Sequence, residues 1–291
     1  MTQHARRSGV VLLVALAMMP SGAVPAEAQT APNPDAARIT AAASLDVLNA
    51  YSFRGIRQDD ETGVVVWPQV ELGVRLYTGD GPLNSVTVRA GSWNSLHNGI
   101  AVAGGLRNDR WSESRTRVGV DLTMVRGVTV GTAYTAYTSP NDVFTTVKEI
   151  SFLASVNDGA APSRLLRPYA LFAFEFDTAP GTGQADGGFE PGKYLEVGVS
   201  PGLSMKRLEI TVPVKLGLSL DGYYELASRD RRFGFASAAG VVRVPLGGRT
   251  GLGTWDVRGG VEYQALGEMT KAINLGDGSN VIGSIGIGWS R

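Results

Sequence analysis

The sequence predicts an all-β fold, an up-and-down antiparallel β-barrel of about twelve strands that crosses a membrane. Three observations predict it. Apolar and polar residues alternate in one segment after another, short and long connections alternate between those segments, and no apolar stretch downstream of residue 20 is long enough for a transmembrane helix. A chain without a helical span can cross a bilayer only as a closed barrel, because every backbone polar group must be paired in lipid.

The N-terminal residues have the pattern of a secretory signal peptide. The basic pair Arg6-Arg7 precedes an apolar run over 10–19, and Ala26-Glu27-Ala28 forms a small-X-small cleavage site. The alternative is a membrane anchor, but the run falls short of the about 20 apolar residues that a spanning helix needs. The expected units are a signal peptide over 1–28 and an outer-membrane barrel over 29–291.

Alternation with a period of two carries most of the fold prediction, because successive strand side chains point to opposite faces. It is cleanest over 64–76 and 208–220, where Val, Leu and Ile occupy one face and mostly polar residues the other. Over 233–246 both faces are similarly apolar, so this strand is the hardest to place. The segments expected to be strands are 39–54, 64–76, 84–93, 114–124, 128–138, 146–156, 166–176, 193–200, 208–220, 233–246, 255–265 and 281–289.

The connections also follow a barrel pattern. Short turns are expected at 78–81, 126–127, 157–159 and 201–202, and longer connections at 56–63, 94–113, 139–145, 177–192, 221–232 and 266–280. Short periplasmic turns and long external loops are typical of outer-membrane barrels. An even number of strands then places both chain ends on the periplasmic side.

Aromatic residues fall on the apolar face, mostly near strand ends, as expected of girdles at the two membrane interfaces. A soluble β-sandwich is the alternative, since its half-buried strands alternate too. Charges on the polar face of nearly every strand, and the length of the strands, argue against it. The aromatic residues expected to face lipid are Tyr51, Phe53, Tyr134, Phe172, Phe174, Phe176, Trp255, Tyr263 and Trp289.

Two short motifs carry a family resemblance. Tyr51-Ser52-Phe53-Arg54-Gly55 resembles the Tyr-X-Phe-Arg-Gly segment that ends the first strand of TorF-like porins, and Gly91-Ser92-Trp93-Asn94-Ser95 is similar to a Gly-X-Trp-X-Ser segment of their third strand. The resemblance implies an outer-membrane location and a channel-like role, without a particular solute. The segment 281–291 resembles the C-terminal targeting strand of outer-membrane proteins, although Ser290-Arg291 follow its aromatic residue.

The first motif also has a physical interpretation. Phe53 is expected to face lipid at the outer interface, Arg54 to point into the lumen, and Gly55 to open a loop. A buried charge needs a partner, so Arg54 is expected to pair with an internal carboxylate such as Asp46 or Glu71. Contact between Arg54 and a solute is the alternative.

The inward face carries nearly balanced charge, which predicts weak ion selectivity. Arg89, Arg115 and Arg117 form a candidate basic ladder, unless charges across the lumen neutralise it. The expected pore-lining residues are Arg54, Glu71, Arg75, Arg89, Arg115, Arg117, Asp121, Glu209, Lys215, Arg258 and Glu262. Further inward charges are expected at Asp46, Glu149, Arg167, Glu175, Glu196 and Asp256. Inward glycines are expected to leave space for a narrow pore at Gly73, Gly91, Gly119, Gly131, Gly198, Gly217 and Gly260.

Composition limits the possible functions. The chain has no Cys, two His and a formal net charge of +0, which excludes thiolate and His-rich metal sites and gives no sign of nucleic-acid binding. No cofactor is expected. The predicted function is a porin-like channel in the cell outer membrane for passive diffusion of small hydrophilic solutes. The expected partners are those solutes, outer-membrane lipids and the outer-membrane assembly machinery.

Two alternatives to a channel stay open. A barrel hydrolase acting on lipid would use His97, with Ser95 two residues away and Asn94 or Asn98 to orient the ring. A structural or adhesive barrel would present loop 177–192, whose Asp177, Asp186 and Glu190 match no EF-hand spacing for Ca²⁺. We therefore expect a barrel that is not an enzyme, with a solvated His97 and a solvated acidic loop.

Overall fold

The computed structural model describes residues 38–58, 63–97, 110–142, 144–158, 166–176, 191–205, 208–226, 229–246 and 253–291. The expected signal peptide over 1–28 lies outside these ranges, as do Asn98 and the three acidic residues of the loop that follows residue 176. No helix within the described ranges is long and apolar enough to span a membrane.

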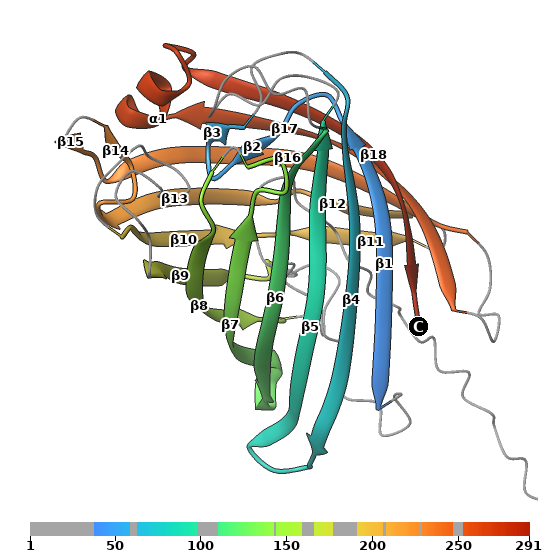
Figure 1. The fold of residues 1–291 in the computed structure, drawn as a ribbon. Coiled ribbons are helices and arrows are strands. Elements are labelled where there is room, and N and C mark those ends of the chain that lie inside the picture. The colour runs from blue at the N-terminus through green and yellow to red at the C-terminus, as the bar shows by residue number, and fades with distance from the viewer. Residues whose placement is uncertain are drawn as a thin grey trace, which may run out of the picture.

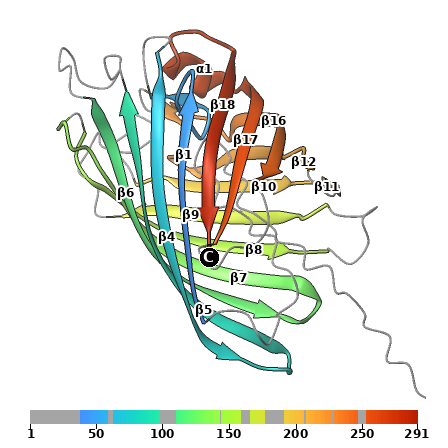
Figure 2. The same ribbon diagram turned by 90° about the vertical axis from the view of Figure 1, so that its right-hand side faces the viewer.

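The protein is all-β, and twelve spanning strands form one closed antiparallel barrel, as predicted (Figure 1). Each strand pairs with the next along the chain, and the barrel closes where β18 lies beside β1 (Figure 2). The spanning strands are β1 (Ile39–Leu48), β4 (Val65–Thr78), β5 (Leu83–His97), β6 (Trp111–Met124), β7 (Val128–Thr138), β8 (Val147–Val156), β9 (Tyr169–Phe176), β10 (Lys193–Val199) with β11 (Gly202–Met205), β12 (Leu208–Thr211) with β13 (Val214–Asp221), β16 (Phe233–Pro245), β17 (Thr254–Leu266) and β18 (Ser279–Ser290).

The last strand closes the barrel along its length. Strand β18 pairs with β1 from Ser290 opposite Ala42 to Ser284 opposite Leu48, and with β17 on its other side. The C-terminal Arg291 extends this pairing, because its backbone exchanges two hydrogen bonds with Ala41. The two residues after the aromatic therefore continue the ladder.

Two spanning strands are interrupted at prolines. Pro213 separates β12 from β13, both of which pair with β16, because a proline has no N–H to give to the ladder. Pro201 likewise separates β10 from β11. The predicted turn at Pro201-Gly202 is wrong. Gly202 begins β11, and the chain reverses only after Met205, so that β11 pairs with β12 as a hairpin. By contrast, the predicted turn at Arg126-Gly127 is present, with both residues at positive φ.

The outer face of the barrel is apolar and its inner face is polar. Leu72, Val261 and Ile285 expose 57%, 59% and 61% of their surface, whereas polar and charged residues of the opposite face are buried or half-buried. Aromatic side chains add to the outer face, where Phe152 stacks on Phe172 and Phe174. This pattern is typical of strands that meet lipid on one side and a lumen on the other.

The segment after the first strand also departs from the prediction. Strand β1 ends at Leu48, and the following residues form a hairpin, β2 (Ser52–Phe53) and β3 (Ile56–Arg57), folded into the barrel. Tyr51 and Phe53 are 1% and 2% exposed, so the prediction that they face lipid is wrong. Arg54 and Gly55, both at positive φ, form the tight turn that reverses the chain.

The hairpin lies at the same end of the barrel as a short helix, α1 (Glu268–Ile273), and a two-stranded flap, β14 (Glu225–Leu226) and β15 (Arg229–Asp230) (Figure 1). We call this end the α1 end. The connections that follow β1, β13 and β17 meet there.

Inward glycines were expected to leave open space, but a Cβ added at any of the seven would lie within 3.1 Å of a neighbouring atom. The Cβ position of Gly198 lies 2.6 Å from the ring of Tyr169, and that of Gly217 lies against the rings of Phe235 and Tyr194. These glycines admit aromatic side chains from neighbouring strands, so the interior at these positions is filled.

Replacing Gly217 by Val should lower the free energy of unfolding by about 1–3 kcal/mol, because the new side chain would overlap the Phe235 ring. Gly240→Val is the matched control, since Gly240 is exposed on the outer face of β16 with open space around it. Urea unfolding in detergent micelles measures both. Equal losses in the two variants would contradict the packing described here.

Candidate functional site

The interior at the α1 end is packed with aromatic residues on both sides of the β2–β3 hairpin. Tyr51 and Phe53 join one cluster, which includes Trp67 and Tyr137 of the barrel wall. Ile56, on the other arm of the hairpin, joins a second cluster of residues from β8–β10, β16, α1 and the segment between β13 and β14. The hairpin therefore bridges two apolar clusters across the barrel.

Arg54, at the tip of the hairpin, is the largest fully buried side chain among the described residues. Its guanidinium donates two hydrogen bonds to Glu149 of β8, with Nη1 2.6 Å from Oε2 and Nη2 3.1 Å from Oε1. Nη1 also donates to the Tyr223 hydroxyl at 2.8 Å. A bidentate pair with a carboxylate is the strongest and most directional contact that a guanidinium makes.

Aromatic faces enclose the same guanidinium. Its carbon lies 4.1 Å from the ring centroid of Tyr194, 5.2 Å from that of Tyr223 and 4.8 Å from that of Phe53. Burial raises the pKa of the Tyr223 hydroxyl well above its ordinary value, although Arg54 opposes that shift, so this hydroxyl stays protonated. We call Glu149 together with Phe53, Tyr194 and Tyr223 the Arg54 cage.

The hairpin backbone is held from two further segments. The Tyr224 hydroxyl donates to the carbonyl of Arg54 at 2.8 Å. Asn274, just after α1, donates from Nδ2 to the carbonyl of Gly55 and accepts at Oδ1 from the backbone N–H of Arg57, each at 2.8 Å. Because three connections of the α1 end share these bonds, the hairpin is fixed in place from several sides.

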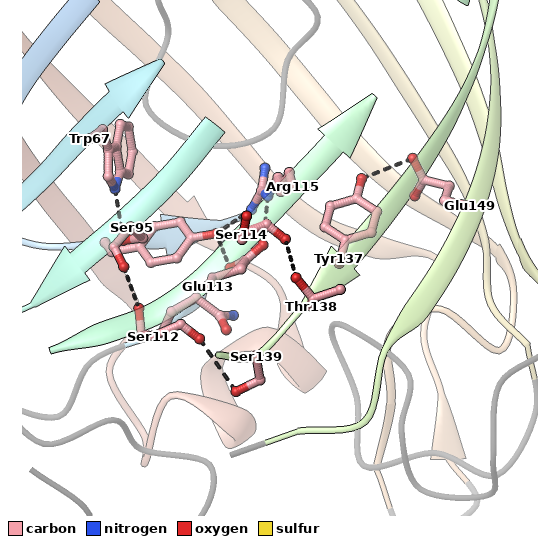
Figure 3. Close-up of polar contacts among 12 residues, drawn as sticks. Trp67, Ser95, Ser112, Glu113, Ser114, Arg115, Tyr137, Thr138, Ser139 and Glu149 are labelled. Atoms are coloured by element: carbon pink, nitrogen blue, oxygen red, sulfur yellow. Dashed lines mark hydrogen bonds and ion pairs between the residues drawn. The ribbon is translucent and has the colours of Figure 1, made fainter. Parts of the chain in front are cut away.

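A second guanidinium, that of Arg115, is enclosed beside the hairpin, and Figure 3 shows it next to Glu113. Arg115 of β6 donates from Nε to Glu113 at 2.6 Å and contacts the Tyr51 hydroxyl, which itself donates to Glu113 at 2.7 Å. The rings of Phe53 and Trp93 lie 4.1 and 4.2 Å from the guanidinium carbon. Arg115 therefore forms part of the packed interior.

His97, at the end of β5, is buried, so the expectation of a solvated loop histidine is wrong. Its Nε2 lies 2.7 Å from Oγ of Ser95, which also accepts a hydrogen bond from Trp67 Nε1 at 3.0 Å. The Tyr51 ring covers it edge-on. Nδ1 has no hydrogen-bond partner within the described part of the chain, so the third group that would orient a catalytic histidine is missing from it.

Charges on the β4–β6 wall form a chain of contacts. Arg89 lies between Glu71 and Asp121, with Nη1 3.0 Å from the Glu71 carboxylate and Nε bonded to Asp121. Arg117 is half-buried on the same wall, and it makes no ion pair with any residue that the structure describes. Arg75 is half-buried nearby on β4.

A second set of ion pairs joins strands that are not adjacent. Arg258 of β17 reaches over β18 to Asp46 of β1, with Nη2 2.6 Å from the carboxylate. Lys215 of β13 lies 3.5 Å from Glu262 of β17, across β16. A contact over an intervening strand requires both side chains to lie on the same face, and the burial of all four residues shows that this is the inner face.

The remaining member of the expected lining, Glu209 on β12, lies between two arginines. Arg167 and Arg243 approach its carboxylate to 3.9 and 3.8 Å, and Arg243 pairs more closely with Asp256 at 2.7 Å. Within the described ranges there is no group of three or more His, Asp or Glu side chains arranged to hold a metal ion.

Arg54 pairs with an internal carboxylate as expected, but the partner is Glu149 rather than Asp46 or Glu71, which bind Arg258 and Arg89. The reason is the inward hairpin, which moves Arg54 away from the end of β1. Of the candidate basic ladder, Arg89 and Arg115 are paired with carboxylates. Neutralisation, the alternative considered from the sequence, therefore applies to both.

Some interior residues were not identified from the sequence. Arg243 lies in the segment 233–246, whose two faces are similarly apolar, so the alternation does not predict that its side chain points inward. Glu113, Tyr223 and Tyr224 fall in regions expected to be external loops, although the structure buries all three. The one available indication of burial was the pair of adjacent tyrosines, Tyr223 and Tyr224, in a connection otherwise rich in charged residues.

No protein-family model matches the chain, and no curated protein matches it. Solved structures do. It is similar to the NanC porin (TM-score 0.42, 13% identity, covering 84% of this chain and 98% of that one) and to the KdgM porin in complex with disordered oligogalacturonate (0.38, 6%, 86% and 98%). It is also similar to the translocator domain of the autotransporter NalP from Neisseria meningitidis (0.41, 12%, 88% and 89%). At these identities the likeness concerns the barrel fold alone.

Asp46→Asn should lower the free energy of unfolding by about 3 kcal/mol or more, because it removes the carboxylate that Arg258 binds inside the barrel. Asp221→Asn is the matched control, since it breaks an exposed pair with Lys193 that contributes at most about 1 kcal/mol. Thermal unfolding in detergent compares the two. A similar loss in both would show that burial does not govern these pairs.

Proposed function

We propose that this protein is an outer-membrane, porin-like channel for passive diffusion of small hydrophilic solutes. The observation that carries the proposal is the closed twelve-strand barrel with an apolar outer face and ion pairs across its inner face. A barrel of this size lies between small barrels filled by side chains and wide porins. A narrow path follows from that size.

The path we propose runs along the β4–β6 wall. At the α1 end the centre of the barrel is occupied by the hairpin and its aromatic clusters. Farther from the α1 end on this wall, Arg75 and Arg117 are half-buried rather than enclosed. Nearby, Arg89 pairs with both Glu71 and Asp121. We therefore assign these five residues as the pore-lining set, with Arg117 as the main determinant of ion selectivity.

The proposal extends to orientation and assembly. The α1 end, with its longer connections, faces outward, and the turns after β4 and β6 face the periplasm. The apolar outer face binds outer-membrane lipids, and the last strand is recognised by the assembly machinery after export. Membership of the TorF-like porins belongs to this proposal and rests on the two short motifs.

A hydrolase is the less favoured function. The contact between Ser95 and His97 is the observation in its favour. Both residues are buried beneath Tyr51, and Nδ1 of the histidine lacks an orienting partner among the residues described. A lipid substrate would have to reach this pair through the packed interior.

Single-channel recording in a planar bilayer tests the proposal. The refolded chain from Gln29 onward, checked for the heat-modifiable migration of a folded barrel, should give discrete and small conductance steps. Folded protein that gives no steps at any voltage would refute the channel.

Arg117→Ala should shift the permeability ratio toward cations, because it removes a positive charge that no carboxylate of the described chain pairs with. Arg126→Ala is the matched control, since it removes the same charge from the exposed turn between β6 and β7. Reversal potentials in a salt gradient measure both. An unchanged ratio in Arg117→Ala would exclude Arg117 as the selectivity determinant.

A further inference from the structure

Arg54 occupies its position at an energetic cost. Its backbone lies at φ +50, in the left-handed region that non-glycine residues rarely adopt. Its Nε is buried without a hydrogen-bond partner in the described chain, and its full charge is removed from water. Buried ion pairs often stabilise a fold no better than apolar residues of similar size. Strained and desolvated positions of this kind cluster at functional sites.

The Arg54 cage has the chemistry of a receptor for an organic cation. Glu149 presents both carboxylate oxygens to one planar guanidinium, while the Tyr194 and Tyr223 rings lie against it. A carboxylate with aromatic walls is how proteins bind guanidinium and ammonium groups. Here the bound group belongs to the hairpin itself, so the site is filled by the protein's own chain.

The surroundings of the cage are acidic. Glu175 lies directly opposite Glu149 across β8 and β9, and Glu196 lies nearby on β10. Glu149, Glu175 and Glu196 expose 2%, 4% and 1% of their surface. Glu196 accepts hydrogen bonds from Tyr169 and Tyr194 and makes no ion pair with a described residue. Without Arg54, Glu149 would be a buried carboxylate that has lost its guanidinium partner, which favours binding of a cation that fits the site.

We propose that the α1 end of the barrel holds a site for guanidinium or ammonium groups, which Arg54 occupies as an intramolecular competitor. The solutes it takes are small organic cations, and such a solute displaces the hairpin tip from Glu149 as it enters. This inference rests on the proposed channel for its biological role, but the binding site itself can be tested without any conduction.

The test is chemical rescue of Arg54→Ala, which removes the guanidinium and keeps Glu149, Tyr194 and Tyr223. At about 10 mM, where its denaturing effect is negligible, guanidinium chloride should raise the Tm of the detergent-refolded variant by about 2–4 °C. Urea, which has the same planar shape without the charge, should leave it unchanged. Wild type should respond less at this concentration, because guanidinium must first displace Arg54 from Glu149.

Arg54→Ala combined with Glu149→Gln is the matched control, since it keeps the cavity and removes the carboxylate; the response to guanidinium should be lost. If Arg54→Ala refolds poorly, the same comparison is made on refolding yield, which guanidinium and not urea should restore. An equal response to urea and guanidinium, or the same guanidinium response in the double variant, would overturn the cation site.

Planar-bilayer recording separates this inference from the channel itself. In Arg54→Ala, millimolar guanidinium on the α1 side should block the current, and the double variant should not be blocked. Thermal rescue without any current would refute the channel and keep the site. Current that guanidinium does not block, with no thermal rescue, would keep the channel and refute the site.

Discussion

The bidentate ion pair between Arg54 and Glu149 determines how the interior is arranged at the α1 end. A guanidinium that is removed from water must find a carboxylate with matching geometry, and Glu149 lies on the far side of the hairpin from the end of β1. Satisfying it requires the chain after Leu48 to turn inward. That turn carries Tyr51 and Phe53 into one aromatic cluster and Ile56 into the other. Tyr224 and Asn274 then find their partners on the same hairpin backbone.

The rest of the interior follows the same constraint with different partners. Asp46, which lies close to the hairpin in sequence, is bound instead by Arg258 from two strands away. Arg115 is enclosed by rings beside the hairpin, as Arg54 is at its tip. Most charged side chains described on the inner face are therefore paired with a side chain of opposite charge. Arg117 on the β4–β6 wall makes no such pair with a described residue.

The fold could be predicted because the alternation along a strand depends only on that strand's own residues and can be recognised without knowing which strands pair with it. All twelve spanning strands follow from it, including β16, whose two similar faces left its inner residues undecided. The hairpin could not be predicted in this way. Over 39–54 the alternation continues through Tyr51 and Phe53, and their direction is reversed by partners distant in sequence, such as Glu149, which is 95 residues from Arg54. Glu113 and Tyr223 were missed for the same reason, since their burial depends on contacts distant in sequence.

The proline break between β12 and β13 has a consequence for the size of the barrel. Thr211 faces Val241 of β16, and Val214 faces Ala238, so both strands advance by the same number of residues across the gap. The carbonyl of Pro213 still accepts a hydrogen bond from Ala239. The interruption therefore removes one donor from the ladder without any slip in stagger. Since strand number and stagger together fix the radius and tilt of a closed sheet, the wall at Pro213 is weakened locally while the circumference is unaffected.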